Sequence, residues 1–166
     1  MRSIVQDNDK LTRSLEEELS FVRDFLDIQM YRFRDRFSYD ITISNESDLL
    51  TDVPKMCIQT YAENALKHGL MQKAEVGTIK INISGTPDVL EIVVEDDGIG
   101  RQRAMEIKTR GTGKGLSLQE RYYDYFNRQN KKKIRWEIID KTDAQGNSTG
   151  TKVIISIPRN FTYTHH

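Results

Sequence analysis

The sequence predicts an α/β fold: a two-layer sandwich in which helices cover one side of a mixed, largely antiparallel sheet. Short segments of alternating polarity, rich in β-branched and aromatic residues, are typical of strands, and longer segments with apolar residues three and four apart are typical of helices. Two pairs of the expected strands are joined by stretches of turn-forming residues, which favours antiparallel hairpins. We expect an N-terminal helix to lie outside this sandwich.

The first expected helix lies within "LTRSLEEELSFVRDFLDIQMYRFRDRF", which contains neither Gly nor Pro and is rich in helix formers. Its seam residues recur at intervals of four and three and are Leu15, Leu19, Val22, Leu26, Gln29 and Phe33. Such a seam is typical of a helix that packs on other helices. Two interpretations stay open: the helix lies on its own domain, or it is half of a helical hairpin in a dimeric bundle.

The next two elements are a strand and a helix. Alternation in "FSYDITIS" predicts a strand over 37–43. Asp52 followed by Pro54 is a typical N-cap and first-turn pairing, so we expect a helix to begin there. This helix should continue to about His68, because Gly69 then provides a stop signal.

The remaining chain predicts two hairpins and a helix between them. Strands over 78–84 and 89–96 flank a Gly-Thr-Pro-Asp turn. Strands over 134–141 and 151–158 flank the polar stretch "TDAQGNST". The helix is expected over 116–129 and follows directly on a cluster of glycines.

Composition limits the classes of function. A chain of 166 residues is one domain, or one domain with an appendage. Lys plus Arg and Asp plus Glu both number 25, so no net charge indicates nucleic acid or an anionic membrane as a partner. No apolar run is long enough to span a bilayer, and the single cysteine, Cys57, suits a reducing compartment. We expect a cytoplasmic chain that is not embedded in a membrane and binds no nucleic acid.

A first glycine cluster, Asp96-Asp97-Gly98-Ile99-Gly100, follows the strand over 89–96 without a spacer. Two glycines separated by one residue let the backbone approach a flat or charged ligand closely. A carboxylate just before them is able to accept a hydrogen bond from an exocyclic amine, as in adenine recognition. The competing interpretation is an ordinary Asp-Gly turn.

A second glycine cluster, "GTGKGLS", opens the helix expected over 116–129. It does not match the Walker A pattern, because Lys108 stands where a glycine is required and Gly115 where Ser or Thr is required. It does not match the dinucleotide fingerprint either, because its glycine spacing is different. Glycine-rich backbone at a helix N-terminus is suited to phosphate oxygens, with Thr112 and Lys114 adding a hydroxyl and a charge. The alternative is a helix-capping loop without a ligand.

The helix expected to end near His68 carries polar residues on one face. Asn64 lies three and four residues before Lys67 and His68, so these side chains are neighbours on the helix. An amide oxygen is a hard ligand suited to Mg²⁺, an ion that keeps several waters and bridges phosphates. A single histidine such as His68, near a helix C-terminus, is more often a capping or packing residue than a ligand. Zinc is not expected, because Cys57 is the only cysteine.

Together, these motifs resemble those of one superfamily. "ENALKHG" at 63–69, "DDGIG" at 96–100 and "GTGKGL" at 111–116 are similar to the N, G1 and G2 boxes of the GHKL (Bergerat-type) ATP-binding fold, which includes gyrase, MutL and histidine kinases. Within it, "YAENALKHG", the short lid and "GTGKGLSLQERYYDYF" look most like LytS-like sensor histidine kinases of bacterial two-component systems. The resemblance implies a dimerisation or linker helix over 1–36, an ATP-binding catalytic domain over 37–160 and a tail over 161–166.

The resemblance also implies roles for individual residues. Asn64 should hold Mg²⁺ and contact ATP, and Asp96 should bind adenine. Gly98 and Gly100 should shape the base pocket. The loop over the phosphates should be formed by Gly111, Thr112, Gly113, Lys114, Gly115 and Leu116.

Other positions near the expected nucleotide are less typical. Lys67 and His68 match positions close to the phosphates. GHKL hydrolases carry a glutamate one turn before the Mg²⁺-binding asparagine, and Thr60 stands there instead. Glu63, adjacent to Asn64, is the nearest carboxylate, and we assign both to the catalytic centre; whether Glu63 polarises a reactant or orients the helix stays open. The lack of a general base suits a kinase, which must keep ATP from water.

Two further features bear on the pocket. Asp97 replaces the Asn that is more usual in the first glycine box, and it should weaken nucleotide binding slightly unless it points to solvent. Residues 101–110 should form a short lid between the base site and the phosphate site.

The resemblance implies a protein histidine kinase that transfers the γ-phosphate of ATP to a histidine and then to an Asp of a response regulator protein. The only histidines are His68, His165 and His166, and none lies in a phosphoacceptor motif. We therefore expect the ATP-binding part of a homodimeric inner-membrane sensor, inactive by itself. Two alternatives are an anti-sigma-type protein serine kinase and a non-catalytic interaction module.

Overall fold

A computed structural model describes residues 11–34, 36–106 and 114–163, although not the side chains of residues 114 and 115. Its main sheet has five strands in the order β2-β4-β5-β7-β6. The strands are β2 (Phe37–Ile43), β4 (Gly77–Gly85), β5 (Val89–Asp96), β6 (Arg135–Thr142) and β7 (Ser148–Pro158). Among the strands of the described residues, only β2 and β4 pair in parallel; β4–β5, β5–β7 and β6–β7 are antiparallel. The predicted mixed, largely antiparallel sheet is confirmed.

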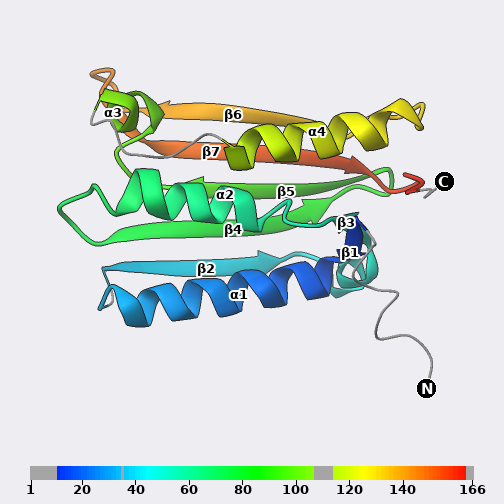
Figure 1. The fold of residues 1–166 in the computed structure, drawn as a ribbon, viewed down its shortest axis with the longest axis horizontal. Helices are drawn as coiled ribbons and strands as arrows, with labels where there is room; N and C mark the ends of the chain where they lie inside the picture. Colours follow the sequence, from blue (N-terminus) through cyan, green and yellow to red (C-terminus); the bar gives the residue numbers. More distant parts are fainter. Residues whose placement is uncertain (1–10, 35, 107–113, 164–166) are drawn as a thin grey trace.

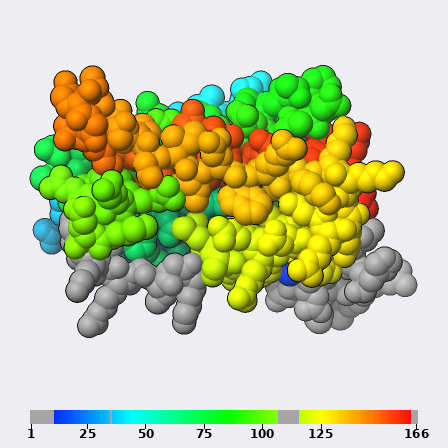
Figure 2. All heavy atoms as spheres, turned by 90° about the horizontal axis from the view of Figure 1, so that it is seen from above, coloured from blue at the N-terminus to red at the C-terminus, as the bar shows by residue number. Residues whose placement is uncertain are grey.

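The long helices cover one face of this sheet (Figure 1). They are α1 (Leu15–Arg32), α2 (Gln59–Asn64) with the π-helix η2 (Ala65–Leu70), and α4 (Lys114–Arg128). Figure 2 shows the β6 edge of the sheet above α4 and the short helix α3 (Arg101–Glu106), so sheet and helices form two layers. The predicted α/β two-layer sandwich is therefore confirmed.

The core lies between these two layers, and its residues come from the periodic segments of the sequence. Every second residue of β4 is fully buried at Ile79, Ile81 and Ile83, because side chains alternate between the two faces of a strand. Tyr123 and Phe126, three residues apart on α4, are buried against the same core. Residues on the opposite face of β4, such as Lys80 and Asn82, are exposed, so the second face of the sheet meets solvent.

The predicted position of the N-terminal helix outside the sandwich is wrong. The first four seam residues of α1 are at most 2% exposed and belong to the common core; they are Leu15, Leu19, Val22 and Leu26. The helix thus packs on its own domain, as the first of the two interpretations held. Its N-terminus is closed by a capping box in which Ser14 and Glu17 exchange hydrogen bonds between side chain and backbone.

The predicted start of the second helix at Asp52 and Pro54 is also wrong. These residues form the short strand β3 (Asp52–Pro54), which pairs antiparallel with β1 (Thr12–Ser14). Pro54 pairs there at the end of a strand, a place that tolerates a missing N–H. The helix begins only at Gln59, after a turn in which Met56 has a φ of 63°. Gly69 does not end the helical stretch, because η2 continues to Leu70.

Candidate functional site

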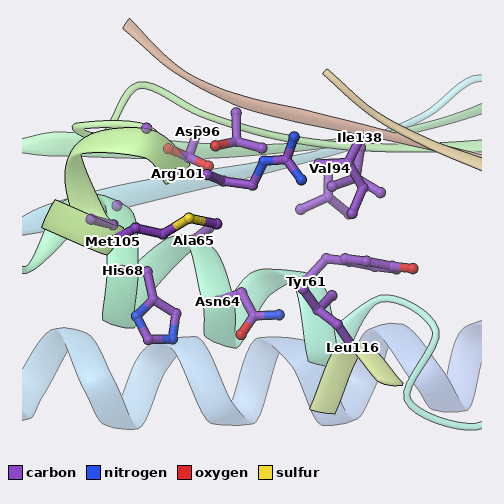
Figure 3. Close-up of a pocket in the computed structure, with 15 residues that line it drawn as sticks. Tyr61, Asn64, Ala65, His68, Val94, Asp96, Arg101, Met105, Leu116 and Ile138 are labelled. Carbon is purple, nitrogen blue, oxygen red and sulfur yellow. The ribbon is translucent and has the colours of Figure 1, made fainter. Parts of the chain in front are cut away.

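One cavity brings together several of the predicted site residues. It has a volume of about 210 Å³ and lies among the end of β5, the α2–η2 stretch, α3 and the start of α4 (Figure 3). Its lining is Tyr61, Asn64, Ala65, His68, Gly69, Val94, Asp96, Gly100, Arg101, Ala104, Met105, Leu116, Ile138, Thr151 and Val153. The walls are largely apolar with a few polar side chains, which is the usual character of a small-molecule site.

Asp96 is the buried acid of this cavity. It ends β5, is 5% exposed, and its Oδ1 accepts the backbone N–H of Gly98 at 2.8 Å. Burial raises the pKa of the Asp96 carboxyl to about 6, against the opposing effects of the Gly98 N–H and the positive charge of Lys141. The carboxylate is therefore mostly ionised at neutral pH, and one of its oxygens is held in a fixed position.

Two glycines allow the loop after β5 to touch the π-helix. A Cβ on Gly98 would lie 2.4 Å from the Cα of Gly69, and a Cβ on Gly69 would lie 2.8 Å from Oδ1 of Asp96. The Ile99 N–H donates to the Gly69 carbonyl oxygen at 3.3 Å. Gly98 itself does not line the cavity; it allows the close approach that places Asp96 beside η2.

Gly100 turns the chain from the first glycine box into α3. It has a φ of +77°, and a Cβ there would lie 1.7 Å from Oγ of Ser148. A side chain is excluded on both grounds, because the backbone is left-handed and the space is filled. The Arg101 side chain then pairs with Asp140 of β6 through two contacts of 2.8 Å, so α3 is tied to the edge of the sheet.

Asn64 and His68 line the cavity from one helical stretch, as Figure 3 shows. The Nδ2 atom of Asn64 is buried and has no hydrogen-bond partner within the described residues. A buried amide without a partner is unfavourable unless a ligand satisfies it. Burial, and then the charge of Lys67, lowers the pKa of His68 below its usual range, so the imidazole is neutral at pH 7. The residues after Asn64 form the π-helix η2, an irregularity frequent at functional sites.

Three nearby charged residues do not line the cavity. Lys67 pairs with Glu63 at 3.1 Å, and Glu63 also accepts a hydrogen bond from Gln59 at 3.1 Å. Asp97 accepts the backbone N–H of Thr78 at 2.7 Å and pairs with Lys73 at 3.3 Å. The expected extra negative charge of Asp97 thus faces β4 and Lys73.

The predicted phosphate loop falls mostly outside the described residues. This applies to Gly111, Thr112 and Gly113. Lys114 and Gly115 form the backbone of the first turn of α4, and Leu116 lines the cavity. Of the predicted lid, the part over 101–106 is the helix α3, and the rest lies outside the described residues.

Sequence reasoning missed several apolar lining residues. Val94 lies two residues before Asp96 on β5, and the register of the sheet pairs Val94 with Val153 and Val153 with Ile138. Alternation along each strand places such residues on one face, so the motif at Asp96 contained the signal for Val94. The neighbours on β6 and β7 depend on strand order, which no local pattern reveals.

The donor set suits a magnesium ion that is shared with phosphates. Among the described residues, no three His, Cys, Asp or Glu side chains gather into a possible metal site. Asn64 nevertheless lines the cavity, and its side-chain amide carries an oxygen that is a hard ligand, beside the Nδ2 donor that has no partner within the described residues. Mg²⁺ is commonly held by one or two protein ligands together with waters and substrate phosphates, so the residues present fit it.

Comparison with protein families then identifies the domain. Residues 52–160 match the family described as histidine kinase-, DNA gyrase B-, and HSP90-like ATPase. The chain belongs to this family of ATPases. The matched region contains Asn64, Asp96 and every other described residue of the cavity lining. The family implies that the domain binds ATP.

The chain is related to the sensor histidine kinases YesM and LytS. It is 29% identical to YesM of Bacillus subtilis (strain 168) over 146 residues, which is 87% of this chain and 24% of YesM. It is 33% identical to the sensor histidine kinase/phosphatase LytS of Staphylococcus aureus (strain Mu50 / ATCC 700699) over 101 residues, which is 60% of this chain and 17% of LytS. The chain thus spans a quarter or less of these relatives.

Solved structures confirm the fold as that of a histidine-kinase catalytic domain. The catalytic domain of histidine kinase ThkA superimposes with a TM-score of 0.59 at 16% identity, covering 89% of this chain and 95% of that one. The mycobacterial sensor histidine kinase MprB gives a TM-score of 0.57 at 15% identity, covering 91% and 98%. Within the described residues, we find no helix with the length and apolar character to cross a membrane.

Proposed function

We propose that the cavity binds ATP with Mg²⁺, and that the chain is the catalytic domain of a sensor histidine kinase that transfers the γ-phosphoryl group to a histidine. The single observation that carries this proposal is the buried Asp96 carboxylate in a largely apolar cavity. A buried, ionised acid is costly unless it has a partner, and the N6 amino group of adenine is a suitable one. The relationship to YesM and LytS supports the kinase assignment.

Asp96 selects the base in this proposal. Its carboxylate accepts the backbone N–H groups of Gly98 and Thr151, and we propose that it also accepts a hydrogen bond from N6 of adenine. Val94, Val153 and Ile138 present an apolar surface for the purine ring. Guanine carries a carbonyl oxygen at the corresponding place, so two acceptors would face each other and binding would weaken.

Asn64 binds the part of the nucleotide that carries the phosphates and Mg²⁺ in this proposal. We assign its amide oxygen to Mg²⁺ and its neighbour His68 to the vicinity of the phosphates, since both line the cavity. When bound, the ion neutralises phosphate charge during phosphoryl transfer. We retain the glycine-rich residues 111–115 as the phosphate loop because they lead into Leu116, which lines the cavity. Lys67 and Glu63 pair with each other, so we propose for them an indirect role in holding α2 and η2.

The phosphoryl acceptor is, in our proposal, a histidine outside the 166 residues. His68 lines the nucleotide cavity, so we assign it to the surroundings of the phosphates and not to phosphoryl acceptance. We propose that the parent protein is a homodimeric sensor at the inner membrane, with this domain in the cytoplasm. We also propose that residues 1–36 continue from its dimerisation region, even though α1 packs on the domain. By itself the chain should bind ATP without autophosphorylation.

The downstream partner in this proposal is a response regulator. ThkA has been crystallised in complex with response regulator protein TrrA, in a structure that matches this chain with a TM-score of 0.53. In that structure, a domain with a fold similar to this chain is bound in a complex with a response regulator. In this proposal, the acceptor histidine first receives the phosphoryl group and then passes it to an aspartate of the response regulator.

The first test is a titration of the chain with fluorescent ADP, in the presence of Mg²⁺ and with the ion removed by chelator. We expect saturable binding in the micromolar to millimolar range, competition by ATP, and weaker binding without Mg²⁺. GTP should compete poorly. Absence of a saturable signal at millimolar nucleotide would refute the proposed function.

A further inference from the structure

Glu18 is a fully buried carboxylate on α1, with an exposed fraction of 0%. Its oxygens accept the backbone N–H groups of Met56 at 3.0 Å, Ile58 at 3.1 Å and Gln59 at 3.3 Å. These are the residues of the turn that leads into α2. Ile58, the residue before α2, makes no side-chain cap, so Glu18 satisfies from another helix the donors that a local cap usually satisfies.

The same carboxylate is joined to the start of the described chain. Arg13, on β1, approaches Glu18 at 3.5 Å and also stacks over the ring of Phe21 at 4.3 Å. Arg13 is paired in register with Val53 of β3, the strand that enters the turn held by Glu18. One buried charge therefore connects β1, α1 and the entrance of α2.

The turn held by Glu18 is only one short helix away from Asn64, which lines the nucleotide cavity. α2 is six residues long, beginning at Gln59 and ending at Asn64. A helix this short transmits a displacement of its first residue to its last, because its hydrogen-bonded backbone leaves little freedom between them. The turn before it contains Met56 with a φ of 63°, a conformation that a non-glycine residue keeps only when its surroundings hold it.

We propose that Glu18 is a positioning residue for nucleotide binding: by holding the first N–H groups of α2, it sets where Asn64 meets the Mg²⁺–phosphate part of the nucleotide. The inference rests on the proposed function of the cavity. It makes α1 and β1 part of the nucleotide-binding apparatus, although neither lines the cavity. Asp96 belongs to β5 and makes no hydrogen bond with Glu18 within the described residues, so base selection should be independent of Glu18.

The test replaces Glu18 by glutamine, which keeps the shape and one acceptor oxygen and removes the charge. The matched control is Glu16→Gln, an exposed residue in the same first turn of α1. We expect E18Q to weaken Mg²⁺–ADP binding about tenfold, a modest coupling between sites. Binding measured without Mg²⁺ should change little, and the preference for ADP over GDP should be kept. E16Q should resemble the unmodified chain in all three measurements.

A second measurement uses the unmodified chain and so does not depend on the stability of a variant. Coupling is reciprocal, so Mg²⁺–ADP should slow amide hydrogen exchange at Met56, Ile58 and Gln59, which do not line the cavity. The proposal is overturned if saturating Mg²⁺–ADP leaves exchange at these amides unchanged. It is also overturned if a folded E18Q binds like E16Q, or if E18Q loses base preference and Mg²⁺ dependence together. If the unmodified chain binds no nucleotide, the proposed function fails first.

Discussion

Replacement of Asp96 by asparagine should raise the stability of the fold and at the same time weaken ADP binding. The carboxyl pKa is raised from 3.8 to about 6, chiefly by burial, so the folded chain binds more protons than the unfolded chain between about pH 4 and pH 6. The neutral acid therefore contributes to the free energy of unfolding below about pH 4, and this contribution is lost as the pH rises through about 6. At about 1.4 kcal/mol per pKa unit, the ionised carboxylate costs on the order of 3 kcal/mol of stability at pH 7.

Asp96→Asn removes this cost, since the amide is uncharged and its oxygen is still able to accept the Gly98 N–H. We expect the free energy of unfolding at pH 7 to rise by about 1–3 kcal/mol, and the melting temperature by roughly 5 °C. The gain should shrink as pH falls to 4. Nucleotide binding should change in the opposite way: the amide NH₂ would face the N6 amino group, so ADP affinity should fall about 10–100-fold. GDP, with a carbonyl oxygen there, should lose less.

The assays are thermal unfolding at pH 5 and pH 7.5 without nucleotide, and competition titrations with ADP and GDP. Asp97→Asn is the matched control, because it makes the same change one residue along at a side chain that faces Thr78 and Lys73. Equal stability changes in the two variants would contradict the cost assigned to the buried acid, and an undiminished preference of Asp96→Asn for ADP would show that this acid does not contact the base.

Three further predictions concern the walls and the metal. Asn64→Ala should bind ADP with the same affinity with and without Mg²⁺, measured by titration; a persistent Mg²⁺ effect would place the ion elsewhere. Gly98→Ala should destabilise the fold by about 1–3 kcal/mol in denaturant unfolding, because its Cβ would lie 2.4 Å from the Cα of Gly69, and unchanged stability would contradict that close packing. Arg101→Gln should alter stability by less than about 1 kcal/mol, because its partner is half exposed, yet speed ADP dissociation several-fold in stopped-flow experiments. Asp140→Asn should do the same, and the double variant no more; additive effects would argue against the pair.

Much of the architecture was predictable because local pattern encodes local structure. The strands over 37–43 and 89–96 were predicted with the bounds that the structure shows. The failures were also local in origin: Asp52 and Pro54 have the residue types of a helix start, but pairing with β1 holds them in a strand. A two-residue signal is weak against tertiary pairing, which decided the outcome.

The residues of the candidate site also fall into two groups, those that local motifs predicted and those that depended on the tertiary structure. Asp96, Gly100 and Asn64 were predicted from their motifs and line one cavity. The orientation of Asp97 was not predictable, because its partner Thr78 belongs to a neighbouring strand. Ile138 was missed for a similar reason, since its place beside Val153 follows from strand order.

By itself, the sequence determined most of the helices and strands of the main sandwich, which face of each is apolar, and where the chain carries the acid, the amide and the glycines of the proposed ATP site. These follow from neighbours within a few residues along the chain. Only the tertiary structure decided that α1 joins the core and that Glu18, some forty residues away in sequence, holds the entrance of α2. Contacts between distant segments depend on which apolar faces bury each other best across the whole molecule, and no single segment contains that information.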